Sequence, residues 1–593
     1  MGENVEIDKL MDNLRELLDE YKELVENNKK DEGIEIMKTV EKVVINMEEL
    51  CTDEEKKKEL IVLHATVNLN VASLYRDIGE LKDHETHLLK CLDLLQKQKI
   101  DMKMKLSPII GCLGRLGMIY SEWNQNEKAL NYFNTLDQIF VDYASVGDDY
   151  IFEEPIFTFM NIINNVEKFK TTLEDFHMLA LYSMVQIYFA LGDHKNSALS
   201  CHRTLCKQLY LNKTTQKLDY IDWVLNAATL SQYFLQIEAF DLARHHLAAA
   251  SYILETYENI LKEKTKENPE SEQNAADWED FKHRSADVAM CWSKYGIILL
   301  DVSKERLLEM SKLDEDNNET FQQMNLKKIS ELKSIANLKF HDLEEKIEPI
   351  ENQVTDQYLL DFDDAKPIFL NVKKWLDQAK SYYTLNEHAS VHVTIAKSLA
   401  GAYYHLAFFE EDGDRQAKMH KRRIDVLESV INELNPQYYK AECRQFWISL
   451  GEAYSDLLST KLDRLNSTDR KPEAIAKINR LAQNSINNYQ RFLDSLDYCF
   501  DDPELRELPD DVLQPTLSSH FHIGRLYGKM ITSDKAVQAD NTEKSINALK
   551  FVVTYCTKYT AASEIMKSEL YLCKELIALL PVRLNKLRES VMK

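Results

Sequence analysis

The chain has 593 residues, only 14 glycines and 11 prolines, and a formal net charge of −25. So few turn-forming residues argue against strand-rich folds and favour helices. The acidity argues against DNA, RNA and anionic membranes as partners, because all of them need a positive protein face, and it favours a partner with a basic surface.

A recurring spacing of apolar and small residues predicts helical hairpins along the first half of the chain. Two amphipathic helices are expected over 5–50, followed by hairpins at 60–98, 110–143, 178–210 and 224–254. The clearest of these hairpins carries Leu113, Leu116, Gly117, Tyr120, Ala129 and Phe133. These intervals match the W-x2-L-G-x2-Y…A-x3-F pattern of the tetratricopeptide repeat, a helix–turn–helix unit of about 34 residues.

Two segments in the middle of the chain, 262–283 and 303–350, lack this spacing, which returns between them at Trp292, Tyr295 and Gly296. Residues 262–283 are polar and nearly devoid of aliphatic side chains, so we expect a disordered loop there. Residues 303–350 are charged and predict one or two long helices, broken near Asp314–Asn318, that link two halves. We therefore expect an N-terminal solenoid over 1–262, a loop and helical linker over 263–350, and a C-terminal solenoid over 351–593.

The repeat pattern returns in the second half. Trp447, Leu450, Gly451 and Tyr454 have the same intervals, and the pattern recurs at 523–527. A helix over 563–579 is expected to cap the end. The predicted fold class is all-α: a tetratricopeptide-repeat α-solenoid in two subdomains joined by a helical linker.

The cysteines and the N-terminus predict a cytoplasmic protein. Ten cysteines occur without a Cys-x-x-Cys pair, and the opening MGENVEIDKLMDNL contains no apolar signal-peptide core. No stretch reaches the ~18 apolar residues that a membrane span requires. We expect free thiols and no membrane insertion.

Residue sets for chemistry are missing from the sequence. Gly528-Lys529 lacks the rest of a phosphate-binding loop, and no Ser/His/Asp or Cys/His set stands out. His388 and His392 have the i, i+4 spacing of metal ligands, but surface or packing histidines explain them better. We predict no enzyme activity, no cofactor and no metal.

Candidate binding residues follow from helix geometry. Ser183 and Gln186 lie beside the packing stripe of one hairpin's first helix, and Thr229 and Gln232 occupy the same positions in the next hairpin. Each pair is three residues apart and so shares one helix face. Two neighbouring repeats would thus present a polar ladder suited to docking a helix; the alternative is that these are ordinary solvated residues.

Several segments resemble the family of KIF-binding proteins, which are kinesin-binding tetratricopeptide proteins. They are CHRTLCKQL (201–209), DWVLNAATLSQ (222–232), LARHHLAAASYI (242–253), KMHKRRIDVLE (418–428), LNPQYY (434–439), NNYQRFLDSL (487–496) and GRLYGKMIT (524–532). They extend from 200 to beyond 530, and several are not generic repeat consensus. The resemblance therefore covers most of the chain.

The resemblance implies a cytoplasmic, cytoskeleton-associated regulator that mainly inhibits the microtubule attachment of selected kinesins. It also implies roles in axon outgrowth and neuronal development, through axonal microtubule organisation, and in mitochondrial and vesicle transport. The partner would be a kinesin motor domain bound by a monomer. The family's motor-contacting positions fall on Ser183, Gln186, Thr229 and Gln232, with Gln208 nearby as a further candidate. Ser183 stands where the family pattern has a larger tyrosine.

The competing hypothesis is a generic tetratricopeptide scaffold or a co-chaperone-like adaptor. Such co-chaperones clamp a C-terminal carboxylate with lysine and arginine on the first helix of each repeat. Here the ladder positions hold serine, glutamine and threonine, and the net charge is unfavourable for an acidic tail.

Overall fold

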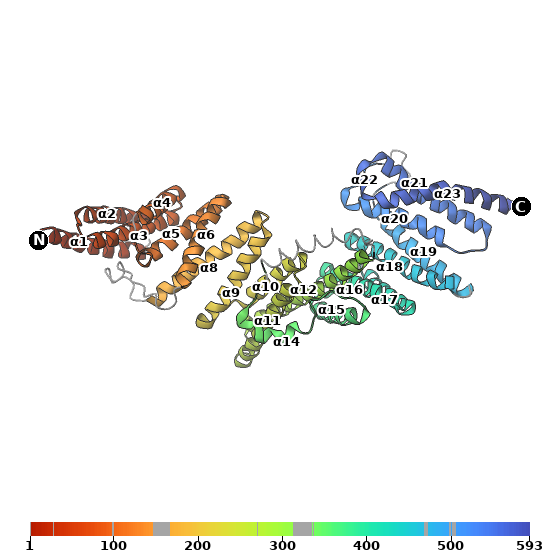
Figure 1. Ribbon diagram of the computed structural model, residues 1–593, viewed down its shortest axis with the longest axis horizontal. Coiled ribbons are helices and arrows are strands. Elements are labelled where there is room, and N and C mark those ends of the chain that lie inside the picture. Colours follow the sequence, from red (N-terminus) through yellow and green to blue (C-terminus); the bar gives the residue numbers. More distant parts are fainter. Residues whose placement is uncertain are drawn as a thin grey trace. The chain divides into compact units, whose positions relative to one another are not determined.

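A computed structural model gives the fold (Figure 1). It describes residues 2–27, 29–97, 100–145, 166–269, 271–311, 335, 337–467, 472–496, 498, 500 and 506–592. Every regular element in these ranges is a helix, which confirms the predicted all-α class. The contacts divide the chain into two compact units, Met1–Leu218 and Asp219–Lys593.

Unit 1 is a series of helices in which each packs against its neighbours along the chain. Its helices are α1 (Gly2–Glu26), α2 (Lys30–Leu50), α3 (Glu54–Ile78), α4 (Leu81–Lys97), α5 (Met102–Glu122), α6 (Asn126–Ser145), α8 (Val166–Ala190) and α9 (His194–Thr215). Gly79 lies at the turn between α3 and α4, and Gly192 at the turn between α8 and α9. Both glycines have positive φ, of 89° and 75°, which a residue with a side chain rarely adopts.

Close helix contact explains the glycine of the repeat pattern in unit 1. A Cβ atom on Gly117 of α5 would lie 2.5 Å from the Phe133 ring of α6, so only glycine lets the two helices approach. Phe133 and Leu116 are fully buried at this contact. The predicted hairpin at 110–143 is therefore α5 and α6.

Unit 2 continues the hairpin arrangement. Its helices are α10 (Tyr220–Gln236), α11 (Phe240–Glu267), α12 (Glu272–Met310), the short η2 (His341–Leu343), α14 (Glu344–Glu351), α15 (Phe362–Tyr382), α16 (Ala389–Phe409), α17 (Gly413–Ile431), α18 (Lys440–Ser467), α19 (Pro472–Asp494), α20 (Asp510–Lys529), α21 (Lys535–Lys558), α22 (Thr560–Ile565) and α23 (Lys567–Met592). Gly451 of α18 repeats the role of Gly117, because its Cβ position lies 2.8 Å from the Tyr489 ring of α19. The final helix packs against α21.

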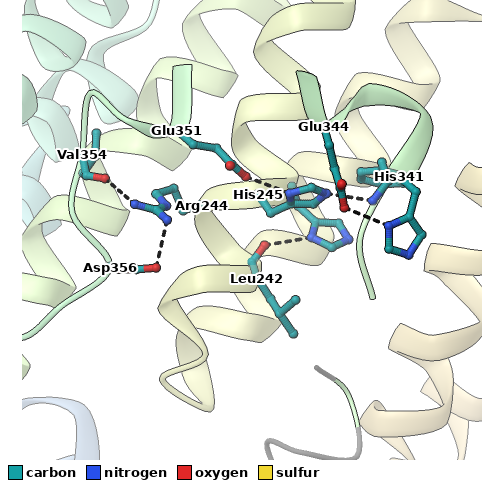
Figure 2. Close-up of polar contacts among 10 residues, drawn as sticks. Leu242, Arg244, His245, His341, Glu344, Glu351, Val354 and Asp356 are labelled. Carbon is teal, nitrogen blue, oxygen red and sulfur yellow. Dashed lines mark hydrogen bonds and ion pairs between the residues drawn. The ribbon is translucent and has the colours of Figure 1, made fainter. Parts of the chain in front are cut away.

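Residues 338–360, which we call the clasp, are bound to α11 by buried polar contacts (Figure 2). Arg244 donates to the Val354 carbonyl at 2.8 Å and to Asp356 at 2.9 Å. His245 Nδ1 lies 2.7 Å from Glu351 Oε1, and its Nε2 accepts from the Phe340 N–H at 2.8 Å. The clasp thereby joins η2 and α14 to the hairpin of α10 and α11.

The prediction of a disordered loop over 262–283 is wrong. These residues form the end of α11 and the start of α12, with a break only between Glu267 and Glu272. Ser271 caps α12 by accepting from the Asn274 N–H, and Trp278 Nε1 donates to Thr265 Oγ1 at 2.9 Å. Good helix formers and one aromatic contact thus hold a polar hairpin that composition alone suggested was unstructured.

The predicted division at 262 and 351 stays a prediction. The clasp crosses the predicted boundary: residues 338–350 lie in the predicted linker and 351–360 in the predicted C-terminal solenoid. It makes hydrogen bonds to α11 and to α12, where Ser303 accepts from the Leu359 N–H. The break expected near Asp314–Asn318 lies outside the described residues.

Candidate functional site

The first predicted pair lies on α8 in unit 1. This helix buries Leu181, Met184 and Ile187. Gln186 is exposed, and Ser183 is half-buried with its hydroxyl donating to the Leu179 carbonyl at 2.9 Å. The hydroxyl of Ser183 is therefore occupied within its own helix, whereas the amide of Gln186 faces outward.

Sequence reasoning missed an apolar stripe beside Gln186. Leu179, Tyr182 and Phe189 are 39%, 50% and 67% exposed. With Gln186 they recur at intervals of three and four residues, so all four share one face of α8. An aromatic side chain thus stands one residue before Ser183. The spacing alone could have revealed this stripe.

Gln208 lies on α9, the partner helix of α8. It is half-buried, and its buried Oε1 accepts no hydrogen bond from the residues that the structure describes. The neighbouring Lys207 forms an ion pair with Glu174 and lies 4.4 Å from the centre of the Phe140 ring. Gln208 therefore has an unused acceptor next to a cation that is already neutralised.

An ion-pair network fixes α9 against α6 near this position. Arg203 donates two hydrogen bonds to Asp137, at 2.6 and 2.7 Å, and His177 lies 2.9 Å from the same carboxylate. Burial opposes ionisation of Asp137, but these hydrogen bonds outweigh it and hold its pKa below the usual range. The backbone that carries Gln208 is thus held in place by the bidentate ion pair between Arg203 and Asp137.

The second predicted pair lies on α10 in unit 2. Trp223, Ala227 and Phe234 are fully buried and fix the orientation of this helix. Thr229 is exposed, and Gln232 is half-buried. The Gln232 Nε2 donates to Ser231 Oγ at 3.1 Å, while its buried Oε1 has no donor within the described ranges.

The structure thus brings Ser183, Gln186 and Gln208 onto one hairpin of unit 1, and it places Thr229 and Gln232 on one face of a helix in unit 2. Gln208 and Gln232 each have a buried amide oxygen that accepts no hydrogen bond from the described residues. The sequence alone could not predict this. Because the five residues belong to different units, their joint ladder stays a prediction.

The candidate metal-binding histidines and a nearby basic run have structural roles. His392 is buried, with Nδ1 2.8 Å from the Tyr383 carbonyl, and His388 packs against the Tyr383 ring. Within the described ranges, no three His, Cys, Asp or Glu residues are grouped to hold a metal ion. Arg423, the last residue of the basic run at 421–423, is buried and paired with Asp456 at 2.6 Å.

A family model matches a part of each of the two units. The model of the family "KIF-1 binding protein C terminal" matches residues 221–587, which begin within α10 and end within α23, and a tetratricopeptide-repeat model matches 110–139, in α5 and α6. The KIF-binding protein of Gallus gallus is 34% identical over 554 residues, covering 90% of this chain and 89% of that protein. The chain belongs to the KIF-binding protein family.

A second relative and a solved structure show similarity over a comparable share of the chain. The KIF-binding protein of Homo sapiens is 31% identical over 542 residues, covering 89% of this chain and 84% of that protein. A solved structure titled "Kinesin binding protein (KBP)" matches with a TM-score of 0.56 and 25% identity, covering 96% of this chain and 98% of that one. The similarity to KIF-binding proteins thus extends over both units. Of the helices described here, none has an apolar stretch long enough to cross a bilayer.

Proposed function

We propose that this protein binds kinesin motor domains and regulates, mainly by inhibition, the attachment of selected kinesins to microtubules. The observation that carries the proposal is membership in the KIF-binding protein family, together with the likeness of the whole chain to a solved kinesin binding protein. A cytoplasmic, cytoskeleton-associated monomer without catalytic activity fits this role. Axonal microtubule organisation and the transport of mitochondria and vesicles are the processes it would serve.

Charge supports the choice of partner. A surface that attaches a motor to the acidic microtubule is basic, and a chain with a net charge of −25 can compete for it. Single exposed ion pairs contribute only about 0.2–1 kcal/mol, so the acidity chiefly speeds encounter. Residence time would come from polar contacts at Gln186, Gln208, Thr229 and Gln232, and from the apolar stripe of α8.

The glutamine contacts are tested with the double variant Gln186→Ala and Gln232→Ala. We expect the Kd for a kinesin motor domain to rise about tenfold or more, because two polar contacts are lost. Anisotropy titration of a labelled motor domain measures the Kd, and circular dichroism shows whether the variant is folded. The matched control is Gln437→Ala with Gln483→Ala, two exposed glutamines elsewhere in unit 2.

Two outcomes would contradict different parts of this proposal. An unchanged Kd in the folded double variant would remove the glutamine contacts while leaving kinesin binding intact. A wild-type protein that binds none of a panel of kinesin motor domains would remove the proposed function itself.

A further inference from the structure

Two neighbouring stretches of unit 2 are strongly basic, although the chain as a whole is acidic. Residues 366–380 of α15 contain four lysines and one aspartate, and residues 415–425 of α17 contain five lysines or arginines and one aspartate. The chain's net charge is −25. Within these two stretches the charge is therefore positive, against the overall trend, whereas the acids Asp363, Asp364, Asp414 and Glu428 lie nearer the ends of the same helices.

Helix geometry aligns these cations into two stripes. Lys366, Lys373 and Lys380 recur every seven residues on α15, and Arg415, Lys418 and Arg422 share one face of α17. We call these six residues the basic patch. Five of them are exposed, and the side chain of Lys373 is 45% exposed.

The two stripes lie close to each other. α16 packs against both α15 and α17. The charge of Arg422 opposes the protonated form of Lys373, although the hydrogen bond and charge of Asp377 keep the pKa of Lys373 above its usual value. The two stripes are thus within electrostatic range of each other at Lys373 and Arg422, on either side of α16.

Most of this positive charge is not neutralised within the protein. Lys373 pairs with Asp377 at 2.8 Å, and Arg415 lies 3.7 Å from Glu410. Among the residues that the structure describes, Lys366, Lys418 and Arg422 have no carboxylate within ion-pair distance. Such cations repel one another and are available to an anionic ligand.

The spacing of the α15 stripe fits one form of that ligand. Residues seven apart on a helix are separated by about 10 Å along its axis. An extended polyproline-II segment rises about 3.1 Å per residue with three residues per turn, so every third side chain faces the same way about 9 Å apart. Leu370, 53% exposed between Lys366 and Lys373, adds an apolar contact for such a segment.

We propose that the basic patch binds an extended acidic segment of a partner protein, with carboxylates at about every third residue. The overall charge favours a short segment over nucleic acid or an anionic membrane. A short peptide feels mainly charges within the Debye length of about 8 Å, whereas a long polyanion or a membrane surface also meets the acidic remainder of the chain. The proposal is independent of kinesin binding.

The test uses the full-length protein and a fluorescein-labelled peptide with glutamate at every third position and one central leucine. We expect anisotropy titration to show saturable binding that weakens with salt. The triple variant Lys366→Glu, Lys418→Glu and Arg422→Glu should raise the Kd for the peptide about tenfold or more. The control variant Lys535→Glu, Lys550→Glu and Lys567→Glu changes the net charge equally at exposed sites in other helices and should leave the Kd within about twofold.

Three results would overturn the proposal. One is equal weakening in both triple variants when circular dichroism shows them folded, because the effect would then reflect net charge alone. Another is no binding of the peptide by the wild type. The third is tighter binding of a single-stranded RNA or of phosphatidylserine vesicles than of the peptide, since the ligand would then be a different polyanion.

Discussion

His64 shows how a charged side chain is accommodated between the helices of unit 1. Its Nδ1 lies 2.9 Å from Glu48 and its Nε2 lies 3.3 Å from Glu41, while only 12% of the side chain is exposed. Burial disfavours the imidazolium, but the two carboxylates outweigh burial and raise the pKa of His64 to about 9. The hydrogen bond between His64 and Glu41 also lowers the pKa of Glu41 to about 2.

This residue predicts a pH dependence of stability. A group whose pKa is raised by folding stabilises the native state fully below its unfolded pKa of 6.5, and that stabilisation is lost as the pH rises through about 9. We expect the free energy of unfolding to fall by about 1–2 kcal/mol across this window, a value reduced by solvent screening. Urea unfolding followed by circular dichroism measures it. His64→Gln should flatten the profile, and an identical profile in the variant would contradict this account.

Two glycines in unit 2 form a matched pair for testing helix packing. A Cβ at Gly451 would lie 2.8 Å from the Tyr489 ring, whereas a Cβ at Gly401 of α16 would meet nothing within 4 Å. We expect Gly451→Ala to lower stability by about 1–2 kcal/mol through overpacking. Gly401→Ala should raise it by about 0.5–1 kcal/mol, because alanine favours the helix. Urea midpoints measure both shifts; a shift in the same direction would contradict the packing argument.

At the scale of elements, spacing predicted most of the helical hairpins. Its success rests on local features: Gly79 at the α3–α4 turn, Asp193 as the N-cap of α9, and apolar intervals that bury one face. It failed where a helix has few aliphatic residues to bury. The Trp278–Thr265 contact that joins α11 to α12 depends on two side chains meeting across a turn, and no periodicity reports such a contact.

The clasp likewise could not be predicted, because its contacts join residues about a hundred positions apart. His245→Ala would remove the partner of both the Phe340 N–H and the Glu351 carboxylate. We expect amide hydrogen exchange over 338–360 to speed up about tenfold or more, since a buried group left without a partner costs about 1–3 kcal/mol. Hydrogen-exchange mass spectrometry measures this rate.

The control for the clasp is His341→Ala, because that side chain is 74% exposed and, in the described part of the chain, pairs only with the exposed Glu344. Its exchange rates should match the wild type. If both variants behaved alike, the buried contacts of His245 would not be what holds the clasp.

At the scale of the whole molecule, the net charge of −25 predicts how a basic partner arrives. Raising the salt concentration should slow the association of a kinesin motor domain about tenfold or more, because screening removes electrostatic steering. The dissociation rate should change much less. Stopped-flow mixing over a salt series measures both rates, and a salt-independent association rate would contradict the steering argument.

The candidate binding residues were only partly accessible to sequence reasoning. Helix phase predicted the outward positions of Gln186 and Thr229, which are exposed. The unsatisfied oxygens of Gln208 and Gln232 depend on side-chain rotamers and neighbours, which no spacing encodes. The spacing of the apolar stripe of α8 is visible in the sequence, but the prediction considered only polar side chains on this face.

Removal of kinesin motors from microtubules is the core of the proposed function. Co-sedimentation of purified kinesin motor domains with microtubules, with and without this protein, tests it most directly. We predict that at least one motor shifts from the microtubule pellet to the supernatant in a complex with this protein. Motors that remain fully in the pellet, with no complex in the supernatant, would contradict the account.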